Sequence, residues 1–179
     1  PPAANALTYN GNEQLLVTAG SVEAKYGEMQ YRLGTSGGFS TAIPAATDAG
    51  TYTVYYKVVG AEGYNDTTAK SIKVTISPVK IKGIGNVASV SKTYDGSADV
   101  TLTADKLTFF SKTAKATNIK LPDTALTFSD AQFTMKQADG SYPPSPDVGN
   151  GKALSFTMTL ANDNYVFEGK PEGTKTVSD

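Results

Sequence analysis

The sequence contains no cysteine, no histidine and no tryptophan. Without cysteine the chain can form no disulfide and can offer no thiolate to a metal or a substrate. Without histidine it lacks the side chain that titrates near neutral pH unaided, which is also the usual base of a Ser or Cys triad. We therefore expect no enzymatic activity, with no catalytic, cofactor-binding or metal-binding residues.

Excess charge and long apolar runs are also missing. The 16 basic and 17 acidic residues give a net charge of −1 and are scattered along the chain. Because no segment is strongly basic, we expect no nucleic-acid partner. No run of about 18 apolar residues occurs, so we expect no membrane insertion. The first residues do not form a signal peptide, and we expect the chain to be a segment of a longer parent protein.

The clearest pattern present is an alternation over residues 51–59. The apolar Tyr52, Val54, Tyr56 and Val58 alternate with Thr51, Thr53, Tyr55 and Lys57. Successive side chains of a strand point to opposite faces, so this pattern predicts a strand with one apolar face. One sheet cannot bury that face alone. A second sheet must cover it, which predicts a β-sandwich.

The pattern recurs in the second half of the chain, where Leu154, Phe156, Met158 and Leu160 alternate with polar or small residues. Three landmarks keep their order in both halves: a Tyr-Asn/Asp-Gly turn at Tyr9 and Tyr94, an Asp-x-Gly turn at Asp48 and Asp147, and a later aromatic at Tyr64 and Tyr165. This internal repeat predicts two β-sandwich domains, at residues 1–78 and 79–179, with the boundary at Pro78. We expect the second domain to carry an insertion around Lys112–Pro122.

Shorter strands and turns account for the rest of the chain. Strands are expected at Gln14–Thr18, Met29–Leu33, Phe39–Ile43, Thr68–Ile76, Val87–Tyr94, Asp99–Thr103, Thr124–Thr134, Lys152–Leu160 and Tyr165–Glu168. Turns are expected where Asn or Asp precedes Gly, at residues 10–11, 95–96, 139–140 and 150–151. The best helical candidate, Ala104–Lys115, is rich in Thr and Ser and predicts at most one short turn.

Several of these blocks resemble known bacterial repeats. Residues 5–78, through LTYNGNEQLLV at Leu7–Val17, MQYRL at Met29–Leu33 and IPAATDAGTYTVYYKVVGAEGYND at Ile43–Asp66, resemble the surface-protein repeats called MBG domains. Residues 79–179 resemble the related YDG repeat, through SKTYDG at Ser91–Gly96 and NDNY at Asn162–Tyr165. The resemblance implies immunoglobulin-like β-sandwiches in tandem on large secreted or wall-attached bacterial proteins, without catalytic residues.

One motif is typical of nucleotide binding but lacks the context it needs. Gly83–Ala88 fits G-x-G-x-x-A, and Asp105 follows about 20 residues later. The residues after the motif are strand-like, so no helix N-terminus is available for a pyrophosphate. We interpret Gly83–Ala88 as a flexible turn between strands or domains.

Four acidic residues of the second half, Asp130, Asp139, Asp147 and Asp163, are candidates for paired-carboxylate chemistry or a calcium site. All four lie near turn or loop signals, which favours solvated turn aspartates. Lys92 with Asn162 or Asn164 leaves open an intramolecular isopeptide bond.

Two exposed tyrosines, Tyr55 and Tyr142, are the candidate ligand-binding residues, because their rings could stack on sugars or on a partner surface. We expect a non-catalytic repeat pair from an extracellular bacterial protein, attached to the cell surface through other parts of its parent. Its expected role is stalk, spacer or adhesion module for an unidentified protein or glycan. The alternative is a carbohydrate-binding accessory module of a larger secreted enzyme.

Overall fold

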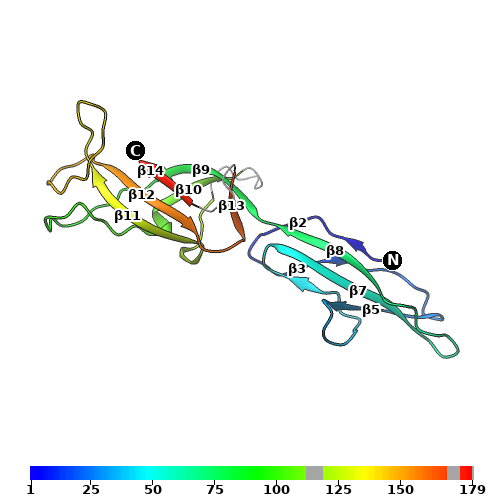
Figure 1. The fold of residues 1–179 in the computed structure, drawn as a ribbon. Coiled ribbons are helices and arrows are strands. Elements are labelled where there is room, and N and C mark those ends of the chain that lie inside the picture. Colours follow the sequence, from blue (N-terminus) through cyan, green and yellow to red (C-terminus); the bar gives the residue numbers. More distant parts are fainter. Residues whose placement is uncertain (112–118, 169–173, 179) are drawn as a thin grey trace. The chain divides into compact units, whose positions relative to one another are not determined.

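The structure is a computed structural model that describes residues 1–111, 119–168 and 174–178. The fold is all-β, and the chain divides into two compact units, Pro1–Pro78 and Val79–Asp179 (Figure 1). Unit 1 contains β1 (Ala3–Ala4), β2 (Leu7–Thr8), β3 (Gln14–Leu15), β4 (Val17–Thr18), β5 (Gly27–Leu33), β6 (Ala45–Ala46), β7 (Gly50–Gly60) and β8 (Lys70–Ser77). Unit 2 contains β9 (Val79–Val87), β10 (Leu107–Ser111), β11 (Leu126–Thr134), β12 (Ala153–Leu160), β13 (Tyr165–Phe167) and β14 (Thr174–Ser178), with 3-10 turns at Ala104–Lys106 and Asp123–Ala125.

Unit 1 is built on a four-stranded sheet with the order β2-β8-β7-β5. The long strand β7 lies at its centre and pairs antiparallel with β5 and β8, while β2 pairs parallel with β8. Two small sheets, β1-β4 and β3-β6, add the rest of the strand structure. The alternation at residues 51–59 therefore does form the expected strand.

The core of unit 1 joins the long sheet to the small sheets. Val54, Val74 and Ile76 from the long sheet are buried with Leu16 and Val17 from the region of β3 and β4. Each of these side chains is at most 2% exposed. This burial of apolar surface between two layers is the main contribution to the stability of a sandwich.

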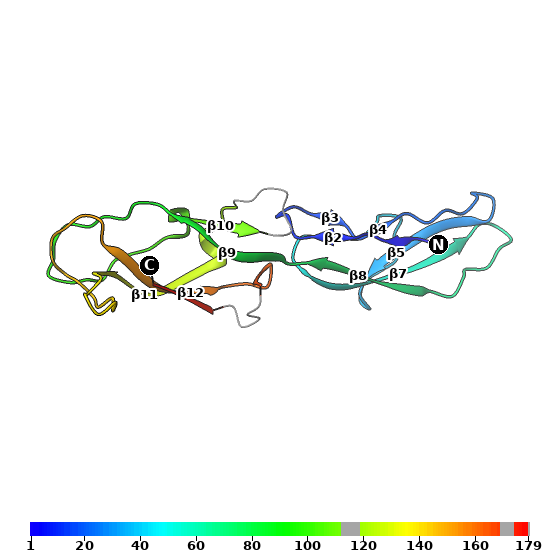
Figure 2. The same cartoon turned by 90° about the horizontal axis from the view of Figure 1, so that it is seen from above.

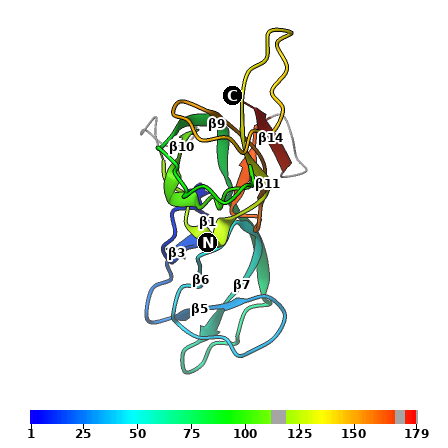
Figure 3. The same ribbon diagram turned by 90° about the vertical axis from the view of Figure 1, so that its left-hand side faces the viewer.

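Unit 2 contains two three-stranded sheets, β10-β9-β13 and β11-β12-β14. Figure 2 shows β11 beside β12, and the end view in Figure 3 separates the layer of β9 and β10 from that of β11 and β14. The core between the layers includes Ile81, Phe109, Phe156 and Met158, each at most 1% exposed. The predicted alternation at residues 152–160 is confirmed as β12.

The structure corrects the prediction of a turn at Gly83–Ala88. Gly83–Val87 belongs to β9, which pairs with β10. The register of this pair shifts twice, so that Lys82 and Gly85 have no partner across the ladder. A glycine within a strand often marks such a bulge. The glycines here therefore permit an irregular strand, and no helix follows them.

Other predicted strands are shorter than expected or missing. Residues 88–94 of the predicted Val87–Tyr94 strand lie outside any strand, and Phe39–Ile43 contributes only a bridge from Ser40 to Tyr31. The predicted Asp99–Thr103 strand is reduced to a bridge from Asp99 to Gln132. The first residues of Ala104–Lys115 form the 3-10 turn, and the next form β10. Most of the expected insertion at Lys112–Pro122 lies outside the described residues.

Candidate functional site

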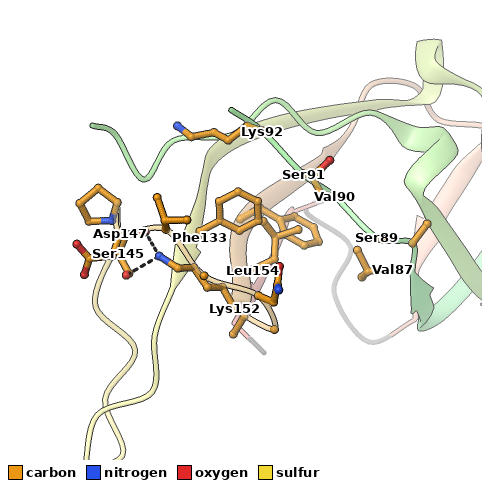
Figure 4. Close-up of a pocket in the computed structure, with 18 of the residues that line it drawn as sticks. Val87, Ser89, Val90, Ser91, Lys92, Phe133, Ser145, Asp147, Lys152 and Leu154 are labelled. Atoms are coloured by element: carbon orange, nitrogen blue, oxygen red, sulfur yellow. Dashed lines mark hydrogen bonds between the residues drawn. The ribbon is translucent and has the colours of Figure 1, made fainter. Parts of the chain in front are cut away.

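Unit 2 contains a cleft of about 1170 Å³ between the segment that leaves β9 and the residues that lead into β12 (Figure 4). Ile84–Lys92 forms one wall, and Ser145–Leu154 forms the other. Apolar side chains of Val87, Val90 and Phe133 are among those that line it. Polar groups share the lining about equally with these side chains, so the cleft offers both apolar contact and hydrogen-bonding partners to a ligand.

One wall of the cleft is a stretch of main chain without a strand partner. Hydrogen bonds hold the stretch at both ends: Ala88 N–H donates to the Lys106 carbonyl at 2.7 Å, and Ala98 C=O accepts from Phe133 N–H at 2.9 Å. Between them, the main-chain N–H and C=O groups of Ser89–Tyr94 make no hydrogen bond to any residue that the structure describes. This is the segment for which the sequence predicted a strand.

The opposite wall carries a lysine that is half-buried. The Lys152 ammonium group donates to the Ser145 main-chain oxygen at 2.9 Å and to the Ser145 hydroxyl at 2.8 Å. Ser145 is only 7% exposed and is held by its own N–H, which donates to the Phe133 carbonyl at 2.8 Å. The ion pairs of the described residues all involve other lysines, so Lys152 has no acidic partner within 4.0 Å.

A second lysine on the cleft, Lys92, is already neutralised. Its ammonium group lies 2.7 Å from the Asp95 carboxylate and 2.6 Å from the Asp99 main-chain oxygen. Hydrogen bonds from Lys92 and from the Ser97 N–H lower the pKa of Asp95. The Lys92 amine is therefore engaged by its own loop, and its contacts with the described residues do not include Asn162 or Asn164, the candidate isopeptide partners.

The candidate ligand-binding residue Tyr55 lies on β7, far from the cleft in sequence and in the other unit. Its ring is covered by the Arg32 guanidinium group at 5.2 Å from the ring centroid, and the same guanidinium lies 4.7 Å from the Phe39 ring. Stacked on a cation, Tyr55 has one ring face already occupied. The sequence did not indicate this stack, because it joins three separate segments.

The candidate Tyr142 is 39% exposed, and the Lys136 ammonium group lies 5.9 Å from its ring. Two other tyrosines, which were not candidate ligand-binding residues, are more exposed. Tyr26 and Tyr64 in unit 1 are 41% and 52% exposed and meet edge to face, with ring centroids 5.4 Å apart. Tyr26 directly precedes β5 and Tyr64 follows β7, so no local spacing in the sequence connects them.

The four candidate aspartates do not form one site. Asp139 accepts hydrogen bonds from the hydroxyl and N–H of Ser141, which lower its pKa as in an ordinary turn. Asp130 has a positive φ of 54° and accepts from the adjacent Ser129 hydroxyl. Only Asp147 lines the cleft. Across residues 1–111, 119–168 and 174–178, no group of three acidic, His or Cys residues is arranged to hold a metal ion.

The groups at this site are suited to binding a ligand. It combines apolar side chains, a row of main-chain donors and acceptors, and one ammonium group with a donor to spare, because an ammonium has three N–H groups. In the described part of the chain, no helix has the length and apolar character needed to cross a bilayer. Comparison with models of known protein families, with curated proteins and with solved structures finds no match to this chain.

Proposed function

We propose that this chain is a pair of immunoglobulin-like repeats of the MBG and YDG types, from an extracellular bacterial protein in which it acts as a non-catalytic, load-bearing spacer. The observation that carries the proposal is the pairing of strands near the ends of each unit. In unit 1 the early strand β2 pairs parallel with the last strand β8, and in unit 2 the first strand β9 pairs parallel with the late strand β13.

Parallel pairing matters because of the direction in which a spacer is pulled. Tension applied at the two ends of unit 1 draws β2 and β8 in opposite directions along their own axes. All the hydrogen bonds that join them are then loaded together, including the one from Tyr9 N–H to the Ser77 carbonyl at 2.8 Å. Forced unfolding depends on the height of the unfolding barrier, and loading several bonds at once raises the force needed to cross it.

Unit 2 also has a parallel pair between its first strand and a late strand, although β14 follows β13 in the other sheet. Val79 pairs with Tyr165 and Ile81 with Phe167. Further bonds extend the pairing: Val79 N–H donates to the Asn164 carbonyl at 2.9 Å, and Glu168 N–H donates to the Ile81 carbonyl at 2.8 Å. A parallel pair between an early and a late strand in both units supports a common repeat origin.

The immunoglobulin-like assignment rests on the way the chain enters unit 1. The segment before β2 pairs antiparallel with β4 through β1, and the chain then crosses to the long sheet as β2. A first segment divided between two facing layers ties those layers together. It also places β2 in the sheet that contains the last strand.

Single-molecule force spectroscopy tests the proposal by comparing two pulling directions on unit 1. Handles at the ends of the unit load β2 and β8 in shear. Handles on cysteines introduced at Thr51 and Thr75, which are direct partners in the antiparallel β7–β8 pair, separate the strands one bond at a time. The chain has no native cysteine to interfere. We expect a clearly higher unfolding force in shear, and equal or lower force would contradict a load-bearing role.

A further inference from the structure

The segment Ser89–Tyr94 has the composition of a strand but no neighbour to pair with. It contains a β-branched or aromatic residue at three of six positions: Val90, Thr93 and Tyr94. Four of its six residues are exposed, and all of them except Thr93 line the cleft. An accessible row of unpaired N–H and C=O groups is the template to which an extended peptide adds as a new strand.

The cleft next to this segment provides surfaces for the side chains of an added strand. Val87, Val90, Phe133 and Leu154 lie around it (Figure 4). Side chains of an extended peptide point alternately to the two sides, so every second residue can enter such a cleft. Main-chain pairing supplies affinity in this mode, and the apolar cleft supplies selection among side chains.

The positive charge of Lys152 indicates which side chain the bound peptide should carry. Lys152 places a half-buried ammonium group on the cleft wall, with no carboxylate of the described residues within 4.0 Å and with a third N–H available beyond the two that bind Ser145. A carboxylate of the ligand would both neutralise this charge and accept that N–H. Hydrogen bonds to charged groups are stronger than those between neutral groups.

We propose that the cleft of unit 2 binds an extended segment of another protein, which pairs with Ser89–Tyr94 as an added strand and places an acidic side chain on Lys152. A glycan would not match the repeating N–H and C=O groups of the segment, which fit a peptide main chain. This inference does not depend on the spacer role of the chain, and either can fail without the other.

The test begins by selecting ligands with the full chain. A phage-displayed library of linear peptides of about 12 residues is panned against it, and enriched peptides are synthesised and measured by fluorescence anisotropy. We expect enriched sequences to combine alternating apolar residues with an Asp or Glu. Lys152→Gln should weaken their binding by about tenfold or more, as expected for loss of one charge-assisted bond. Lys73→Gln, which removes an exposed charge from unit 1, should leave binding unchanged.

Amide hydrogen exchange then locates the bound peptide. The amides of residues 89–94 should exchange rapidly in the free protein, because nothing in the described structure protects them, and should slow on peptide binding. The proposal is overturned if no peptide is enriched, if bound peptides leave these amides unprotected, or if Lys152→Gln binds as well as the native chain. It is also overturned if the amides are protected beforehand by association of two copies, which sedimentation would reveal.

Discussion

Thr8 and Ser77 are direct neighbours across the parallel β2–β8 pair, and both side chains are exposed. Neighbouring strands lie about 4.8 Å apart, within the range that a disulfide spans. We expect Thr8→Cys with Ser77→Cys to form a disulfide under oxidising conditions. The bond would shield the intervening residues from tension, so that the unfolding step of unit 1 disappears from force–extension traces and returns on reduction.

Thr51 and Thr75 provide the control disulfide. They are partners in the β7–β8 pair, and their hydroxyls lie 3.2 Å apart. A disulfide there should leave the unfolding step in place and only shorten it. If the Thr8–Ser77 disulfide failed to form or left the step unchanged, the parallel pairing on which the spacer role depends would be wrong.

Gly60 lies at the end of β7, where the chain turns back toward β8. A Cβ at this position would lie 2.2 Å from the Tyr64 main-chain oxygen, a contact that the turn can relieve only by moving its backbone. We expect Gly60→Ala to lower the free energy of unfolding by about 1–3 kcal/mol, as overpacking does. Gly38→Ala is the control, because a Cβ there meets nothing within 4 Å. Urea unfolding followed by tyrosine fluorescence would measure both, and equal stability of the two variants would contradict the turn geometry.

The sequence predicted the long strands well because a strand with one face toward the core alternates apolar and polar residues along the chain. In β7 Val54 is buried, with Tyr52 and Tyr56 packed against the same core, and in β12 Phe156 and Met158 are buried. β10 was missed because Leu107 and Phe109 lie inside Ala104–Lys115, a segment rich in Thr and Ser that was considered only as a helical candidate with at most one short turn. Local patterns carry no information about which short strands find partners, and this is why residues 88–94 were predicted as a strand.

The cleft could not be predicted for a related reason. Its parts come from segments about 60 residues apart, and the position of Lys152 beside Ser145 depends on how the chain before β12 folds back on β11. No spacing in the sequence encodes that contact. The interpretation of the aspartates as turn residues holds at Asp139 but was wrong at Asp130, which lies within β11 at its register shift.

Asp99 links the start of unit 2 to β11 and should make stability depend on pH. Its carboxylate accepts hydrogen bonds from the Gln132 amide at 2.7 Å and from the Ser97 hydroxyl at 3.0 Å, and these lower its pKa below the ordinary 3.8. Because the folded pKa is the lower one, the stabilisation is fully present above the unfolded value. It is lost as pH falls from 3.8 through the folded pKa.

We therefore expect Asp99→Asn to reduce the loss of stability between about pH 6 and about pH 3, measured from urea midpoints. Gln132→Ala removes the principal donor and should reduce the pH dependence in the same direction. A pH dependence identical to that of the native chain in both variants would show that the carboxylate is not held as the structure indicates.

Phe156 should report on unit 2 alone. It is 1% exposed in the core of that unit and meets the Phe128 ring edge to face, with centroids 5.9 Å apart. Truncation of a buried Phe costs about 3–5 kcal/mol, a large part of the stability of a small domain. If each unit folds around its own core, Phe156→Ala should shift one thermal transition in calorimetry and leave the other in place.

The converse variant completes the test. Val54 is fully buried in the core of unit 1, and Val54→Ala should lower only the transition that Phe156→Ala leaves unchanged. The two cores share no residue, so each substitution removes apolar contacts from one unit only. If either variant moved both transitions together, the units would unfold as one cooperative body, and a tandem pair of independent repeats would be the wrong description of this chain.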